Sequence, residues 1–192
     1  MTKKTLVGID AGSEQSGIVV ISDGIIQVGD TIGNSHIFDF IINARNSCEG
    51  FVVAVEDMRP YNMRITDGVI QTIKFIGQLE WRLREAGIIY DLIPRWQVKQ
   101  WVFLQYRTIL EPLIDRKIYL AAERKIKAGK KPRNASASFV YVDDRMVSTA
   151  MREYWKIEKV KRVGQTAFLK DHAWSALAVA SLHIVSNTPF FR

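Results

Sequence analysis

Short apolar runs separated by glycine and aspartate predict the strands of this chain. The runs cover residues 5–10, 16–22, 25–30, 51–56 and 88–93. The tripeptide Ser22-Asp23-Gly24 between two apolar runs is typical of a β-hairpin, so we expect the first three strands to be antiparallel. The run FVVAVE at 51–56 is almost entirely apolar, which is typical of a strand that is buried on both faces.

Apolar residues at helical spacing occupy the segments between and after these strands. Val69, Ile73 and Ile76 share one face of a predicted helix over 66–86. Further helices are predicted at 35–48, from Pro94 onward, and at 108–128, 143–155 and 169–186. This order favours a central sheet covered by helices on both faces, in an α/β fold. We expect one domain over residues 1–192, with a basic helix and loop excursion at about 108–140.

Composition narrows the class of protein. Hydrophobic residues make up 47% of the 192 positions, enough for a full core. No apolar run reaches the roughly 18–20 residues that span a bilayer, and no small-residue cleavage site follows the N-terminal MTKKTLVGID. Cys48 is the only cysteine, which excludes an internal disulfide and a cysteine-based zinc site. We therefore expect a cytoplasmic protein with no membrane contact.

Positive charge is concentrated in one stretch. Residues 116–133 hold eight Lys or Arg and one Glu, and their net charge of +7 equals that of the whole chain. A charge run of this kind is either a solvated helix face or a contact for a phosphate backbone.

Two carboxylates stand at the ends of apolar strands. Asp10 ends VGID and Glu56 ends FVVAVE. Burial of an unpaired carboxylate is costly, so each requires a partner. If the two strands are neighbours, both side chains meet at one end of the sheet, where Mg²⁺ or Mn²⁺ is the cation that suits oxygen ligands.

The helix predicted at 169–186 offers a third group, because Asp171 and His172 lie in its first turn. The alternative is that Asp171 caps the helix and that His172 is a surface residue. We interpret Asp57 and the pair Asp143-Asp144 as solvated or capping residues. His36 and His183 lie on amphipathic helices and are interpreted as structural.

Four motifs, in order, resemble those of RuvC-type Holliday junction resolvases. They are GIDAGSEQSGIVV in the first strands, VAVED in the central strand, PRWQVKQWV at a helix start and DHAWSALAVA in the last helix. The middle and end of the chain are most similar to the RuvC-like resolvases of phages and prophages, in which a segment such as VDDRMVSTAMREYW precedes the histidine. The resemblance extends over nearly the whole chain.

This resemblance implies a ribonuclease H-like fold with a mixed five-stranded sheet, three strands antiparallel and then two parallel. It also implies hydrolysis of DNA by two Mg²⁺ or Mn²⁺ ions, with no small-molecule cofactor. Asp10 and Glu56 match the family's metal ligands, and His172 falls where some members have histidine. Ser175 stands where many members have a carboxylate, and Asp171 is a possible replacement.

The implied substrate is a four-way DNA junction, cleaved symmetrically by a homodimer whose interface would be the helix at 66–86. Candidate DNA contacts lie after Glu56, in the third motif and in the basic stretch. They are Arg59, Tyr61, Arg64, Lys99, Lys117, Arg124, Lys125, Lys127, Lys130, Lys131 and Arg133.

Three other functions are compatible with these residues. A nuclease of the same fold could act on branched or flap DNA or on RNA–DNA hybrids. An actin-like or sugar-kinase ATPase opens with a similar hairpin, but it usually needs two copies of the fold and a second glycine loop. The serine at position 175 is also compatible with a junction-binding protein that has lost catalysis.

Overall fold

The structure is a computed structural model that describes residues 4–46, 48, 50–59, 65–113, 142–157, 169 and 172–187. Its strands are β1 (Lys4–Asp10), β2 (Gln15–Ser22), β3 (Ile25–Gly33), β4 (Gly50–Asp57) and β5 (Ile89–Pro94). Its helices are α1 (Asn34–Arg45), α2 (Asp67–Glu85), α3 (Arg95–Gln105), α5 (Asp144–Tyr154) and α6 (His172–Ser186). Residues 107–113 are also helical.

The five strands form one mixed sheet in the order β3-β2-β1-β4-β5. β1 and β2 are antiparallel, as are β2 and β3, whereas β4 pairs parallel with both β1 and β5. The predicted arrangement of three antiparallel strands followed by two parallel ones is therefore confirmed. The central position of β1 explains its apolar sequence, because both of its faces are covered.

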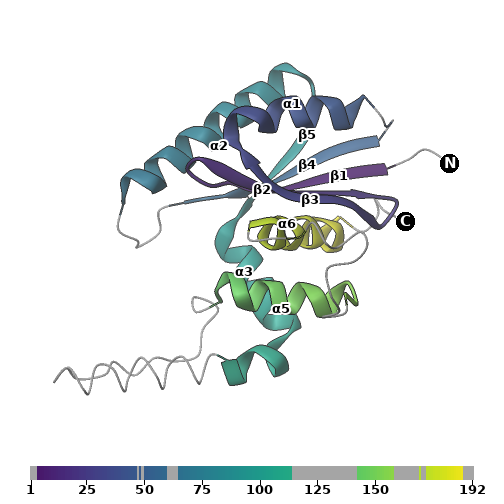
Figure 1. Cartoon of the computed structure of the whole chain (residues 1–192), viewed down its shortest axis with the longest axis vertical. Coiled ribbons are helices and arrows are strands. Elements are labelled where there is room, and N and C mark those ends of the chain that lie inside the picture. The colour runs from purple at the N-terminus through teal and green to yellow at the C-terminus, as the bar shows by residue number, and fades with distance from the viewer. Residues whose placement is uncertain are drawn as a thin grey trace.

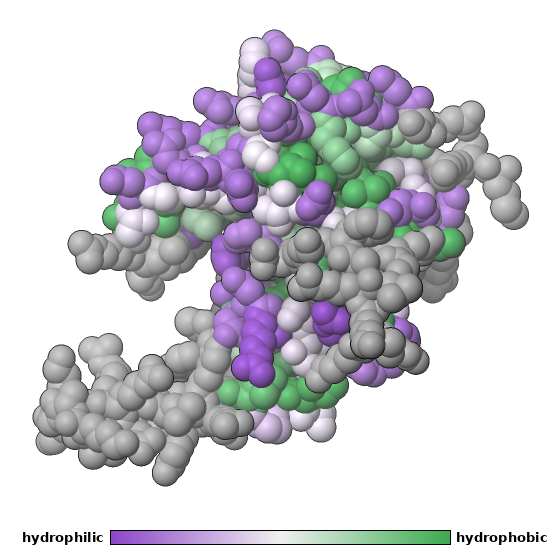
Figure 2. All heavy atoms as spheres, in the orientation of Figure 1, coloured by the Kyte–Doolittle hydropathy of each residue, from purple (hydrophilic) through white to green (hydrophobic). Residues whose placement is uncertain are grey.

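Helices cover the two faces of the sheet unequally (Figure 1). α1 and α2 lie on one face, where Ile37, Ile41 and Leu83 pack against alternate residues of β1 and β4. α6 lies on the other face, and α3 and α5 pack against α6 in a further layer (Figure 1). Figure 2 shows mostly hydrophilic residues over the outer side of α1 and α2, as expected for a solvent-exposed layer.

The alternation of side chains assigns each strand residue to one face. Leu6, Val52 and Ala54 belong to the core under α6, and Val7 and Val53 belong to the core under α1 and α2. The same period of two directs Asp10 and Glu56 to the α6 face.

α6 approaches the sheet closely because it meets glycine there. A Cβ on Gly8 would lie 2.5 Å from the carbonyl oxygen of Ala176 and 2.8 Å from Cβ of Ala180. A larger residue on either element would therefore separate the helix from β1. The small side chains of Ala176 and Ala180 thus allow α6 to pack closely on the sheet.

The start of α6 differs from the prediction. The helix begins at His172 and not at residue 169. Leu169 lies outside the helix, with its side chain buried against β3, where a Cβ on Gly29 would lie 2.4 Å from Cδ2 of Leu169. Packing of this leucine on the sheet thus outweighs the helical pattern of its sequence. Among the helices of the described ranges, none is long and apolar enough to cross a membrane.

Candidate active site

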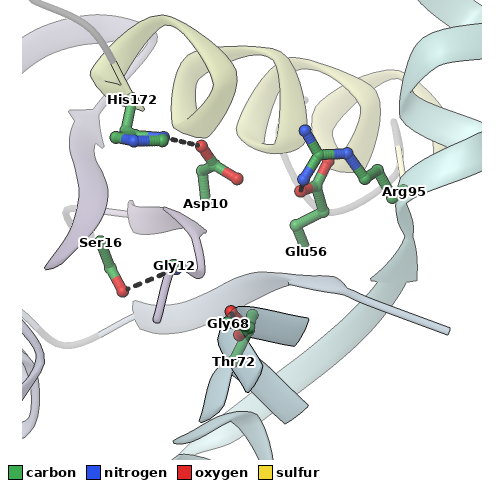
Figure 3. A network of polar contacts seen from close by, with 8 residues as sticks. All are labelled: Asp10, Gly12, Ser16, Glu56, Gly68, Thr72, Arg95 and His172. Carbon is green, nitrogen blue, oxygen red and sulfur yellow. Dashed lines mark hydrogen bonds and ion pairs between the residues drawn. The ribbon is translucent and has the colours of Figure 1, made fainter. Parts of the chain in front are cut away.

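Two buried carboxylates lie side by side where β1 and β4 end. Ile9 pairs with Val55 in the parallel register, so the next residues along, Asp10 and Glu56, lie at the same level. Both side chains are on the α6 face, and the residues are only 3% and 4% exposed. Figure 3 shows the two carboxylates directed into the same region below α6. The predicted convergence of Asp10 and Glu56 is therefore present in the structure.

His172 contacts Asp10 from the first position of α6. Its Nδ1 lies 2.9 Å from Oδ2 of Asp10, and its side chain is 49% exposed. The hydrogen bond to Asp10 raises the pKa of His172, although burial opposes the rise. Gly17 makes this position possible, because a Cβ there would lie 2.2 Å from the carbonyl oxygen of His172. With Nδ1 directed to the carboxylate, Nε2 is the nitrogen that remains for other contacts.

Glu56 forms an ion pair with Arg95, the first residue of α3. Nη1 of Arg95 lies 3.4 Å from Oε2 of Glu56, and the Arg95 side chain is 36% exposed (Figure 3). Burial raises the pKa of Glu56 well above its usual range, and the neighbouring Asp10 carboxylate raises it further. Glu56 in turn raises the pKa of Arg95. Arg95 thus compensates part of the negative charge that the strand ends bring together.

The turn after Asp10 is held by a small hydrogen-bond network. Backbone N–H of Gly12 donates to Oγ of Ser16 at 3.3 Å, and this hydroxyl donates to Oδ1 of Asn34 at 2.6 Å. Nδ2 of Asn34 donates to the carbonyl oxygen of Gly12 at 3.0 Å. This closed set of contacts ties the turn to the first residue of α1, and so fixes the chain that leaves Asp10.

Comparison with solved structures shows the same fold in Thermus thermophilus RuvC. That structure matches with a TM-score of 0.56 and 16% sequence identity, over 96% of both chains. The chain has the RuvC fold. T. thermophilus RuvC in complex with Holliday junction substrate matches with a TM-score of 0.56 and 14% identity, over 96% of this chain and 97% of that one. Neither a family model nor a curated protein matches the sequence.

Within this RuvC fold, the donor set suits a divalent cation in part. Asp10 and Glu56 supply buried oxygen ligands, and a cation between them would relieve the repulsion that raises the pKa of Glu56. Among the described residues, however, no three His, Cys, Asp or Glu side chains are grouped closely enough to hold a metal ion. The two strand-end carboxylates are thus positioned, whereas a third ligand is not brought to them.

Two of the other predicted site residues lie within the described ranges. Lys99 is one turn after Arg95 on α3, and its half-buried side chain interacts electrostatically with Glu56 and Asp10. Burial is the main cause that lowers the pKa of Lys99, followed by the positive charge of Arg95. Lys99 therefore lies at the candidate active site. Arg59 is exposed and its Nε donates to Oδ2 of Asp57 at 2.5 Å.

The remaining candidates lie outside the described residues. They are Asp171, Tyr61, Arg64, Lys117, Arg124, Lys125, Lys127, Lys130, Lys131 and Arg133. Their proposed roles in metal and DNA binding stay predictions.

Sequence reasoning missed Arg95, although it lies within the motif PRWQVKQWV. Its signal was the position directly after Pro94, because β5 is parallel to β4 and ends level with Glu56. A residue that follows such a strand lies at the same sheet end as the carboxylates. The interpretation of His183 as structural agrees with its burial and with its contact to Asp91, at 3.0 Å.

Proposed function

We propose that this chain is a divalent-metal-dependent endonuclease that resolves four-way DNA junctions by symmetric nicks. One observation carries the proposal: Asp10 and Glu56 lie buried side by side at the ends of parallel strands, with His172 beside them, in a RuvC fold. Burial of two adjacent carboxylates is unfavourable unless the site binds a cation, so their placement favours a metal-binding function over a structural one.

In this proposal Asp10 and Glu56 would hold the divalent ions, and Nε2 of His172, the ring nitrogen that does not contact Asp10, would serve as the base. Metal ions supply charge for the scissile phosphate and activate water. Asp10 orients His172 through Nδ1, so that Nε2 is available to accept the proton of the attacking water. The water oxygen bonds to phosphorus as the bond from phosphorus to the leaving strand's oxygen breaks.

Arg95 and Lys99 provide positive charge beside these groups. Both lie on one face of α3, one turn apart, and both interact electrostatically with Glu56. We propose that they bind oxygens of the DNA backbone at the cleavage site, because a guanidinium and an ammonium group are suited to phosphate. Two-fold symmetric cleavage of a junction requires two such sites, which favours a homodimer.

The test is cleavage of a synthetic four-way junction labelled in turn on each strand, with Mg²⁺ and with Mn²⁺. The wild-type chain should nick two opposing strands at symmetric positions, and Asp10→Asn should lower the rate by a factor on the order of 100 or more. Asp39→Asn is the matched control, because Asp39 is an exposed carboxylate on α1, which covers the other face of the sheet. Unchanged cleavage by Asp10→Asn would refute the assignment.

The same assay separates the alternatives. Equal or faster cleavage of flap DNA or of RNA–DNA hybrids would indicate another nuclease of this fold. A second candidate function, junction binding without hydrolysis, is favoured by Ser175 on α6 and by the two-ligand arrangement of the described residues. Tight junction binding without cleavage in either metal would support that candidate.

A further inference from the structure

Two contacts between a histidine and an aspartate tie α6 to the sheet, one at each end of the helix. At the first residue of α6, Nδ1 of His172 lies 2.9 Å from Oδ2 of Asp10 on β1. In the last turn of α6, Nδ1 of His183 lies 3.0 Å from Oδ2 of Asp91 on β5. The first contact belongs to the candidate active site, whereas the proposed reaction does not use the second.

Both histidines lie on the side of α6 that faces the sheet. From His172 to His183 the helix makes about three turns and rises by roughly 16 Å, so the two residues point in nearly the same direction. Ala176 and Ala180 lie on this side between them and meet Gly8 of β1. α6 therefore crosses the sheet from β1 to β5, which is the strand at one edge.

His183 is buried, whereas the Asp91 side chain that it contacts is 54% exposed. Burial lowers the pKa of His183 more than Asp91 raises it, so the ring is neutral near pH 7 and its Nδ1–H donates to the carboxylate. A cavity of about 380 Å³ adjoins this contact, and its lining includes Ile93, Gln97 and Leu182. Because this corner is not filled by side chains, the hydrogen bond contributes more to the attachment of α6 to β5 than it would in a filled core.

The two elements that this contact joins also carry groups of the candidate active site. Arg95 follows β5 directly, and His172 begins α6. A helix is a rigid element, so a shift of its last turn is transmitted to its first residue. We propose that the contact of His183 with Asp91 fixes α6 along its axis and so holds His172 against Asp10. The inference rests on the proposed function where it concerns catalysis.

The test is Asp91→Ala in the full-length protein without metal, followed by the nitrogen NMR chemical shifts of the neutral His172 ring. In wild type these shifts should show the proton on Nδ1, where Asp10 holds it. In Asp91→Ala a substantial share of the protein should carry the proton on Nε2, because His172 leaves Asp10. Asp91→Asn keeps an acceptor oxygen for His183 and should retain the wild-type shifts. The Tm of each variant shows that it folds.

Tyr90→Phe is the matched control on the same strand. Tyr90 precedes Asp91 on β5 but faces α2, where its hydroxyl donates to Oε1 of Glu80 at 2.9 Å. The substitution removes a hydrogen bond from β5 without a change at α6, so it should lower the Tm and leave the His172 shifts unchanged.

A second readout is junction cleavage under single-turnover conditions. Asp91→Ala should lower the rate by roughly 10- to 100-fold, as a small misplacement of a catalytic group does, while the junction Kd stays within about twofold of wild type. Wild-type His172 shifts in Asp91→Ala, an unchanged cleavage rate, or an equal change in Tyr90→Phe would overturn the inference. If the shifts change as expected but wild type cleaves no junction, the proposed function fails and the positioning role stands.

Discussion

Replacement of Gly17 by alanine tests whether the close approach of α6 to the sheet builds the candidate site. Gly17 pairs with Asp10 in the antiparallel register of β1 and β2. A Cβ there would lie 2.2 Å from the carbonyl oxygen of His172 and 2.8 Å from its Cβ, both of which belong to the first residue of α6. Ordinary contact begins at 3.4 Å, so the start of α6 would have to move by about 1.2 Å.

The expected loss of stability follows from two opposing effects. Insertion of a methyl group into a well-packed contact costs about 1–3 kcal/mol. Alanine also restricts the unfolded chain, which returns roughly 0.4–1 kcal/mol. We therefore expect a net loss of about 1–2 kcal/mol, which lowers Tm by roughly 2–8 °C for a domain of this size. The displacement also lengthens the 2.9 Å contact between His172 and Asp10 beyond hydrogen-bond distance.

The assay is urea unfolding of wild type, Gly17→Ala and Gly77→Ala under identical conditions. Gly77 lies inside α2, and a methyl group added there would have nothing within 4 Å, so alanine should stabilise the protein by roughly 0.5–1 kcal/mol. The two variants make the same chemical change and should shift the midpoint in opposite directions. A Gly17→Ala protein as stable as Gly77→Ala, with an unchanged pKa of His172, would refute the reasoning.

Two further predictions concern the ionisable groups. In the metal-free protein, proton NMR should show a pKa of His172 above 6.5 because of its bond to Asp10, and a pKa of His183 below 6.5 because its burial outweighs its contact with Asp91. His172 then contributes stability that is lost as the pH rises through its folded pKa, whereas His183 contributes stability that is lost as the pH falls through its folded pKa. The reverse order of titration would contradict both assignments. Ser175→Asp adds a carboxylate one turn after His172 and should tighten Mn²⁺ binding by about tenfold or more, whereas an unchanged calorimetric Kd would show that position 175 does not face the ion.

The sequence was sufficient for the sheet and for the two strand-end carboxylates. Apolar runs of six or seven residues that are separated by glycine and aspartate favour strands over helices, so the strands were placed within a few residues. Asp10 and Glu56 could be recognised because each interrupts an apolar pattern. A polar residue at a position that must be buried is informative without any structure.

Contacts that depend on helix packing could not be predicted in the same way. Arg95 is a charged residue at a helix start, where charge is common and has several explanations. The approach of Arg95 to Glu56 depends on the pairing of β5 with β4, a contact between distant parts of the chain that no local pattern encodes. The start of α6 was misplaced for a related reason, because Leu169 fits the helical period but packs against β3.

The charged residues of this site come from separate strands and helices, and the strand register and helix packing explain why. Asp10 and Glu56 are adjacent through the strand register, which leaves no room between them for a third strand residue. Arg95 follows β5 directly, and His172 reaches Asp10 only because Gly17 allows α6 to contact the sheet. The parallel strands thus concentrate negative charge, and the starts of the surrounding helices decide how much of it remains for a cation.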